Sequence, residues 1–123
     1  MDPALQTARY INLTTFRKDG REVATPVWCA VVNGKLCFYT VGNSGKVKRI
    51  RATRRVKVAP SDGRGKPLGA WSEGIGRILS DPAEAARVYQ AISAKYGWQY
   101  ALINFFAWIT RRVDRRITLE LTL

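Results

Sequence analysis

The chain has 123 residues, the size of one domain with a single hydrophobic core. It carries 21 lysine and arginine residues against 9 acidic ones, and this net charge of +12 favours a polyanion, a nucleic acid or an anionic lipid surface over a neutral partner. It contains no histidine, which excludes Ser-His and Cys-His nucleophilic pairs and removes the usual zinc ligand. We therefore expect residues 1–123 to form one basic domain without a metal site.

Cysteine content and hydropathy bear on the compartment. Cys29 and Cys37 are too few for a disulfide framework, and the N-terminal stretch MDPALQTARY contains no apolar segment typical of a signal peptide. The longest apolar run, residues 100–109, is about half as long as a membrane-spanning helix and contains Asn104. We expect a cytoplasmic protein without a transmembrane segment. Peripheral membrane contact through the last arginines stays open. These are Arg111, Arg112, Arg115 and Arg116.

The first third of the chain predicts three antiparallel strands. Residues 10–16, 22–32 and 35–41 are β-rich, and Asn33-Gly34 is the strongest two-residue hairpin signal in the chain. In that hairpin, positions that sum to 67 face each other, so Cys29 would face Phe38 and Ala30 would face Cys37. The two cysteines would then lie on opposite faces of the sheet, which makes a disulfide between them unlikely in geometric terms.

The remainder predicts alternating helices and strands. A short basic helix follows Ser44, and two strands over 55–61 and 70–79 flank a loop at 62–67 that is long enough to move. Asp81-Pro82-Ala83-Glu84 predicts a helix start, with Asp81 as the N-cap and Glu84 closing a capping box, in a helix that runs to about Tyr96 and ends at Gly97. An aromatic helix from 98 to about 111 and a final strand near 117–122 complete the order.

This order predicts a mixed, mainly β (α+β) domain. We expect a small antiparallel barrel of six to seven strands with short helices packed outside. Trp28, Tyr39 and Trp71 fall on outward or edge positions, and a homodimer is the simplest cover for them. The aromatic residues of the last helix are expected in helix packing or a dimer contact rather than in a ligand cage. Glu73 is either the partner of Arg77 or a catalytic acid.

The segment 44–57 is the most informative part of the chain. It contains seven cationic residues and no acidic one, directly after a strand and a Gly/Asn/Ser turn. Ser44, Gly45 and Lys46 would place a hydroxyl, free backbone N–H groups and a full charge at a helix N-terminus, which suits a phosphate. The alternative is a solvated basic helix. The cations of this segment are Lys46, Lys48, Arg49, Arg51, Arg54, Arg55 and Lys57.

Several segments together resemble a known family. The strings TPVWCAVVNGKLCFYT, GKVKRIR, RVKVAPSDGRG and WSEGIGRIL, in this order and spacing, are similar to the split β-barrel of the pyridoxamine 5′-phosphate oxidase superfamily. Within it, the chain resembles the actinobacterial oxidoreductases that bind a deazaflavin, coenzyme F420, in place of FMN. The resemblance covers residues 10–79 well and the last third of the chain loosely.

The resemblance implies a homodimer with two cofactor sites at the subunit interface. Pro26, Val27 and Trp28 would give backbone contacts to the ring system, and Trp71 would pack on the ring from the partner chain. FMN enzymes of the superfamily commonly have an arginine where this chain has Gly45, which disfavours FMN. The phosphate side would be held by Thr40, Ser44, Lys46, Lys48 and Arg49.

The implied activity is hydride transfer from the reduced deazaflavin to an unidentified small organic substrate. Such a site needs no acid or base residue, because the protein supplies binding and orientation. No catalytic residue is therefore assigned, and the proton would come from water or from Tyr39. The cations from Arg51 to Lys57 are assigned to the acidic tail of the cofactor or to solvation.

Two other functions stay open. One is a carrier or storage protein of the same fold that binds coenzyme F420 or FMN without turnover. The other is a nucleic-acid-binding module, which the charge allows. The basic segment has no stacking aromatics among its cations, so we expect no nucleic acid partner.

Overall fold

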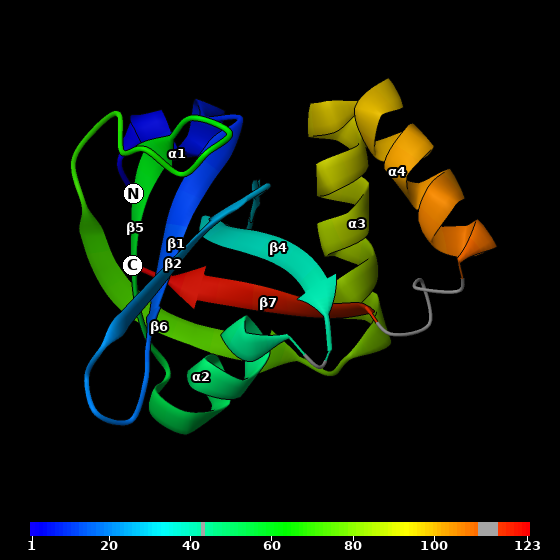
Figure 1. The fold of residues 1–123 in the computed structure, drawn as a ribbon. Helices are drawn as coiled ribbons and strands as arrows, with labels where there is room; N and C mark the ends of the chain where they lie inside the picture. Colours follow the sequence, from blue (N-terminus) through cyan, green and yellow to red (C-terminus); the bar gives the residue numbers. More distant parts are fainter. Residues whose placement is uncertain (43, 111–115) are drawn as a thin grey trace.

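The protein is described by a computed structural model that defines residues 1–42, 44–110 and 116–123. One antiparallel sheet of seven strands forms the body, and four short helices surround it (Figure 1). The strands are β1 (Tyr10–Phe16), β2 (Glu22–Val27), β3 (Ala30–Val32), β4 (Lys35–Val41), β5 (Arg55–Ser61), β6 (Ser72–Leu79) and β7 (Arg116–Thr122). The helices are α1 (Pro3–Thr7), α2 (Gly45–Thr53), α3 (Pro82–Tyr96) and α4 (Trp98–Ile109).

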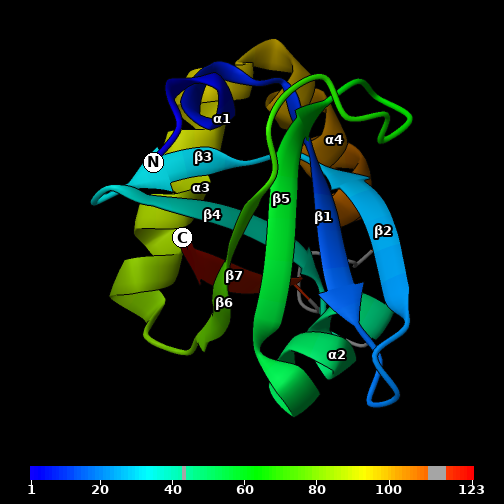
Figure 2. The ribbon, with the colours of Figure 1, turned by 90° about the vertical axis from the view of Figure 1, so that its left-hand side faces the viewer.

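The strand order defines a split β-barrel. Strands follow one another as β2-β1-β5-β6-β7-β4-β3, so β2 and β3 are the two edges of the sheet. Only Trp28 and Cys29 separate these two strands in the chain. The sheet must therefore curl until its edges approach each other (Figure 2). Among the described residues β2 and β3 form no ladder with each other, so the chain itself closes the seam. This is the predicted fold class, with seven strands.

The predicted strand over 22–32 is wrong at its centre. The chain leaves β2 at Trp28 and enters β3 at Ala30, because it crosses from one edge of the barrel to the other. The Asn33-Gly34 hairpin is confirmed, with φ angles of 51° and 77°, and so is the pairing of Ala30 with Cys37. The predicted pairing of Cys29 with Phe38 is wrong, because the ladder between β3 and β4 starts at Ala30 and Cys29 still belongs to the crossing between the two edges.

Two hydrophobic clusters stabilise the domain. The first fills the barrel and includes Phe38, Leu119 and Cys29, and the second lies between the sheet and α3 and includes Cys37 and Ile92. The cysteines are therefore buried in separate clusters, and both are free, as predicted. Complete burial of such side chains contributes roughly 1.5–3 kcal/mol each.

Several helix starts follow their capping residues. The carboxylate of Asp81 accepts a hydrogen bond from the Ala83 N–H (3.0 Å), so the predicted N-cap of α3 is confirmed. Glu84 does not close a capping box, because its carboxylate binds Arg77 at 2.9 Å. Helix α1 was not predicted from the sequence, and its Leu5 is fully buried in the barrel cluster.

The loop over residues 62–67 is a closed turn. The Asp62 carboxylate accepts hydrogen bonds from the N–H groups of Arg64 and Lys66, both at 2.9 Å. Asn12 Nδ2 donates to the Gly65 carbonyl oxygen (2.8 Å), which ties the loop to β1. Together with two backbone hydrogen bonds between Asp62 and Lys66 and between Gly65 and Asp62, both at 3.1 Å, these contacts define the shape of the loop and its position; its movement stays a prediction.

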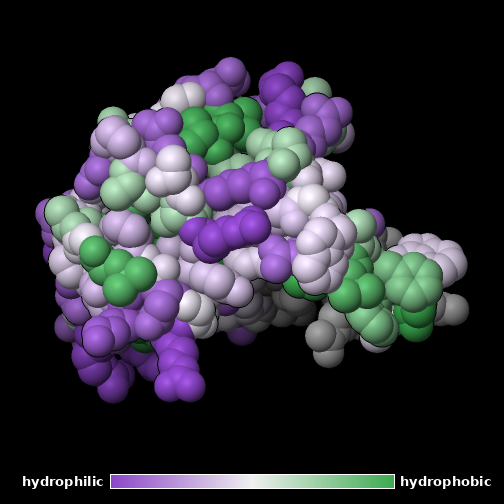
Figure 3. All heavy atoms as spheres, turned by 90° about the horizontal axis from the view of Figure 1, so that it is seen from above, coloured by the Kyte–Doolittle hydropathy of each residue, from purple (hydrophilic) through white to green (hydrophobic). Residues whose placement is uncertain are grey.

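Helix α4 has an unusual surface. The helix contains no charged residue. It leans away from the body of the domain and exposes large apolar side chains (Figure 3). Trp98, Phe106 and Trp108 are 73%, 57% and 68% exposed. These three and Phe105, 53% exposed, do not pack in the core of this chain, so for them the dimer contact is the part of the prediction that stays open; Tyr100 packs against the second cluster. Within the described residues, no helix has the length and apolarity needed to cross a membrane.

Candidate functional site

The predicted anion site lies at the start of α2. Ser44 is the N-cap, and its Oγ accepts a hydrogen bond from the Val47 N–H at 3.5 Å. Val47 and Ile50 are buried against the barrel, which fixes the rotation of the helix about its axis. This rotation turns Arg49 toward β1 and leaves Lys48 on the exposed face. The first turn of α2 therefore presents unpaired backbone N–H groups beside cationic side chains.

Gly45 leaves room for the side chain of Arg49. A Cβ atom at position 45 would lie 2.6 Å from Arg49 Nη1, so the guanidinium folds over the first turn of its own helix. Arg49 Nε donates to the hydroxyl of Thr15, which is fully buried on β1, at 2.6 Å. A charged hydrogen bond of this kind orients the guanidinium before any ligand arrives.

Burial and neighbouring cations disfavour the charged forms of Lys46 and Arg49. The pKa of Lys46 is lowered by desolvation and then by the charge of Arg49, and the pKa of Arg49 is lowered by desolvation and then by Arg17. Across the described ranges, neither these residues nor Lys48 form an ion pair. An anion placed among them would relieve both the desolvation and the repulsion.

A second set of cations comes from the β1–β2 hairpin. A cavity of about 380 Å³ lies between this hairpin and α2, and Arg17, Lys18 and Arg21 line it together with Lys48 and Arg49. Asp19 also lines it and pairs with Arg21 at 2.7 Å, so the lining carries five cations and one carboxylate. Sequence analysis treated Lys18-Asp19-Gly20 only as a turn. The missed signal was the three cations on either side of Asp19, which the hairpin brings to α2 because β1 runs toward that helix (Figure 2).

Two later cations of the basic segment, Arg55 and Lys57, pair with acidic residues. Arg55 pairs with Glu73 (3.6 Å) and its guanidinium carbon lies 4.1 Å from the centre of the Phe16 ring. Lys57 pairs with Glu22 at 2.9 Å. The suggested pairing of Glu73 with Arg77 is wrong, because Arg77 binds Glu84 and Glu120 instead.

Thr40 lies in a different cavity. It lines a space of about 410 Å³ between β4 and α4, together with Tyr39 and Arg116. Burial raises the pKa of Tyr39, so its hydroxyl is protonated at neutral pH. The structure therefore places Thr40 and Tyr39 beside each other, on the strand that leads into the Ser44 turn.

The three residues expected to contact a ring system are largely committed to the fold. Pro26 and Val27 pair with Asn12 and Ile11 on β1, and Val27 packs against the barrel cluster. Trp28 stacks on Tyr96 of α3. The backbone of this segment is the part that remains for a ligand, in line with the contact type that the resemblance implies.

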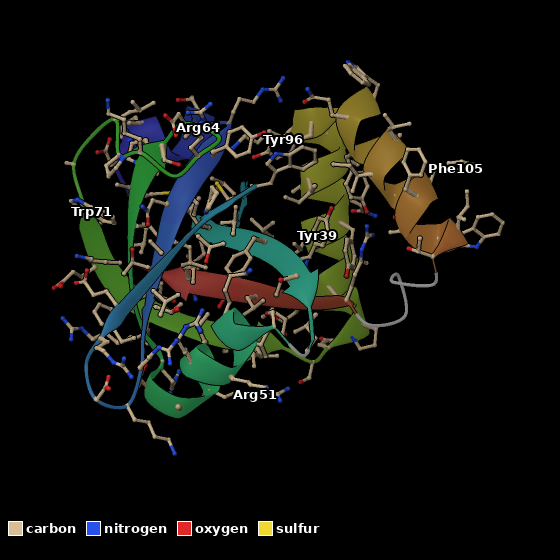
Figure 4. All side chains as sticks on the ribbon, viewed as in Figure 1. Tyr39, Arg51, Arg64, Trp71, Tyr96 and Phe105 are labelled. Atoms are coloured by element: carbon tan, nitrogen blue, oxygen red, sulfur yellow. The ribbon has the colours of Figure 1, made fainter. Side chains whose placement is uncertain are left out.

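Trp71 lies apart from these residues in one copy of the chain. It is 42% exposed beside the ammonium group of Lys57, which is 4.7 Å from the centre of one of its rings. Figure 4 shows Trp71 and Tyr39 on opposite sides of the barrel. Of the three aromatics expected to need a partner surface, Trp28 and Tyr39 pack against the chain's own helices. They no longer support a homodimer, which stays a prediction.

No metal site is found in the part of the chain that the structure describes. Its cysteine, aspartate and glutamate residues form no group of three that could hold an ion. The site is therefore built from cations, backbone N–H groups and hydroxyls.

Comparisons with known proteins support the fold. No protein-family model matches the sequence, and a search of curated proteins gives no match. Solved structures do match. A conserved hypothetical protein from Mycobacterium tuberculosis is 21% identical, with a TM-score of 0.73 over 99% of this chain and 80% of that one. An F420 reductase is also 21% identical, with a TM-score of 0.59 over 96% of this chain and 89% of that one.

A heme storage protein from Vibrio cholerae, HutZ, has the same fold at 8% identity, with a TM-score of 0.72 over 97% of this chain and 84% of that one. At such identities the likeness establishes the split barrel alone. Proteins of this fold thus include an F420 reductase as well as a heme storage protein.

Proposed function

We propose that this protein is a coenzyme F420-dependent oxidoreductase that transfers a hydride from the reduced cofactor to a small organic substrate. The observation that carries the proposal is the anion site at the start of α2, where Lys46, Lys48 and Arg49 lack acidic partners within the described chain. The family resemblance and an F420 reductase among proteins of the same fold support it.

The donor set fits the anionic parts of this cofactor. Ser44, the backbone N–H groups of Gly45 and Lys46, and the Lys46 ammonium would hold its phosphodiester. The acidic tail would lie in the cavity between the β1–β2 hairpin and α2, where Arg17, Lys18 and Arg21 meet Arg49. We prefer this cavity to the cations from Arg51 to Lys57, because Arg55 and Lys57 pair with Glu73 and Glu22. In the cavity only Arg21 has an acidic partner among the described residues, Asp19 at 2.7 Å.

When bound, the reduced deazaflavin supplies the hydride. The protein's part is to bind and orient, and the chain supports this with a rigid guanidinium at Arg49 and a protonated hydroxyl at Tyr39. The Tyr39 hydroxyl is the candidate proton donor to the substrate, since Tyr39 and Thr40 line the same cavity.

Binding without turnover is the main competing function. A heme cargo is disfavoured, because the chain has no histidine and both of its cysteines are buried. FMN is disfavoured by Gly45. A homodimer with sites at the interface is part of the proposal, and the exposed apolar face of α4 is a candidate for coverage by a second copy.

The test is a fluorescence titration of the purified protein with coenzyme F420, FMN and a DNA duplex at two salt concentrations. We expect tight F420 binding and weak, steeply salt-dependent DNA binding. Lys46→Ala should lower F420 affinity by roughly 1.5–3 kcal/mol, as expected for a charged hydrogen bond. Lys66→Ala, in the exposed 62–67 loop, is the matched control and should leave it unchanged.

FMN copurifying as a yellow protein would overturn the F420 assignment, and an unchanged affinity in Lys46→Ala would remove Lys46 from the site. Turnover is tested separately. Reduced F420 must be oxidised faster in the presence of protein and a candidate substrate than with protein alone. Tight binding without such a rate increase would favour the carrier function.

A further inference from the structure

Arg116 is the centre of an aromatic cage. Its guanidinium carbon lies 4.5 Å from the ring centre of Tyr39, 5.9 Å from that of Tyr100 and 6.0 Å from that of Tyr89. These rings come from β4, α4 and α3, so three elements hold one cation. Arg116 Nη1 also donates to Asn104 Oδ1 on α4 at 2.7 Å. The guanidinium is thus fixed in position rather than free in solvent.

This cation has no acidic partner among the residues that the structure defines. The guanidinium contacts three π faces and one amide oxygen, and the hydrogen bond to that oxygen uses one of its five N–H donors. A half-buried guanidinium with spare donors favours a planar anion, because a carboxylate can accept two parallel N–H···O bonds from it.

The space next to Arg116 suits an apolar body. The cavity of about 410 Å³ falls within the usual range for small-molecule sites. Ile103, Phe106 and Ala107 of α4 line one wall, and Tyr39 and Thr40 of β4 line the other. The site therefore combines apolar walls with a single cationic group at one point.

We propose that the cavity between β4 and α4 binds a small monocarboxylate with an apolar body, with the carboxylate on Arg116 and the apolar part against Ile103, Phe106 and Ala107. The site stands on its own residues and does not depend on a cofactor. If the proposed function also holds, Thr40 places this ligand beside the cofactor and makes it a candidate for the substrate class.

The test is calorimetric titration of the cofactor-free protein with trans-cinnamate and with its neutral analogue cinnamamide. We expect cinnamate to bind at least about tenfold more tightly, since only the acid can pair with a guanidinium. Equal affinity for the two compounds, or no binding of cinnamate at millimolar concentration, would overturn the proposal. This comparison uses the wild-type chain, so it does not rely on a variant that folds.

Variants then locate the site. Ala107→Trp should fill the cavity and abolish cinnamate binding, while Ala101→Trp, at an exposed position of the same helix, should preserve it. Arg116→Gln should lower cinnamate affinity at least tenfold, and Arg87→Ala, an exposed cation on α3, should not. Retained affinity in Ala107→Trp would place the ligand elsewhere. Because no F420 is present, failure here leaves the cofactor proposal intact, and the reverse also holds.

Discussion

The indole of Trp28 lies flat on the phenol ring of Tyr96, with ring centres 4.2 Å apart and ring planes within 5° of each other. This stack joins the bend between β2 and β3 to the last turn of α3. The Tyr96 hydroxyl accepts a hydrogen bond from the Cys29 N–H at 3.0 Å and shares its own proton between the carbonyl oxygens of Arg9 and Cys29, at 2.9 and 3.0 Å. The neighbouring Lys95 ammonium also donates to the carbonyl oxygens of Cys29 and Ala8, at 2.8 and 2.7 Å, so two consecutive residues at the end of α3 hold the seam of the barrel.

We expect Tyr96→Phe to lower the free energy of unfolding by about 1–3 kcal/mol. The ring stack would persist, but the Cys29 N–H would lose its buried acceptor. Urea unfolding followed by circular dichroism measures the change. Tyr10→Phe is the control and should stay within about 0.5 kcal/mol of the wild type, because the Tyr10 hydroxyl has no hydrogen bond among the described contacts. If both variants lowered the free energy of unfolding equally, the Tyr96 hydroxyl would not stabilise the seam.

Thr15→Val should weaken coenzyme F420 binding without removing a charge. The substitution keeps the shape of a fully buried side chain and removes the acceptor that orients Arg49. We expect a several-fold rise in the dissociation constant, since the guanidinium would have to be ordered on binding. Fluorescence titration measures it. Thr25→Val on the neighbouring strand is the control, and a loss of affinity in both variants would point to a general change in the sheet.

Gly74→Ala should destabilise the fold by about 1–3 kcal/mol, the usual cost of overpacking. A Cβ atom at this position would collide with the backbone carbonyl oxygen of Thr122 and lie 2.9 Å from a methyl group of Leu123. Gly63→Ala offers a matched comparison, because its new Cβ would lie 3.6 Å from the Tyr10 ring, an ordinary contact. Thermal unfolding of the two variants should therefore differ, and matching melting temperatures would contradict the close approach at Gly74.

Asp62 should make the 62–67 loop sensitive to acid. Hydrogen bonds from the N–H groups of Lys66 and Arg64 hold the pKa of its carboxyl below the ordinary value of 3.8. A lowered folded-state pKa means that the stabilisation is present above the unfolded-state pKa and is lost as the pH falls through the folded-state value. The stability difference between the wild type and Asp62→Ala should therefore shrink below about pH 4. A difference that stays constant from pH 7 to pH 2 would rule this out.

The fold was largely predictable because local signals agree with it. Asn33-Gly34, Ser44, Asp81 and Gly97 mark turns and helix ends through their own backbone and capping chemistry, and each stands where it was expected. The break at Trp28 was not predictable, since it depends on the closure of the barrel and not on any local breaker. The burial of Leu5 depends on the same long-range geometry.

Only the part of the candidate site whose residues are neighbours in sequence could be predicted. Ser44, Gly45, Lys46 and Arg49 are neighbours in sequence and form one group in the structure. The contribution of Arg17 and Arg21 was missed, because it requires the β1–β2 hairpin to reach α2. The cage around Arg116 unites residues from β4, α3, α4 and β7, which no sequence spacing brings together.

The closure of the barrel by Trp28 and Cys29 protects the chain against self-association. Each of β2 and β3 has a strand neighbour on one side only, so each keeps a row of backbone groups that another strand could pair with. The stack of Trp28 on Tyr96 keeps these two edges turned toward each other. A variant that frees the bend would expose both edges at once, and self-association into extended sheets would then compete with refolding.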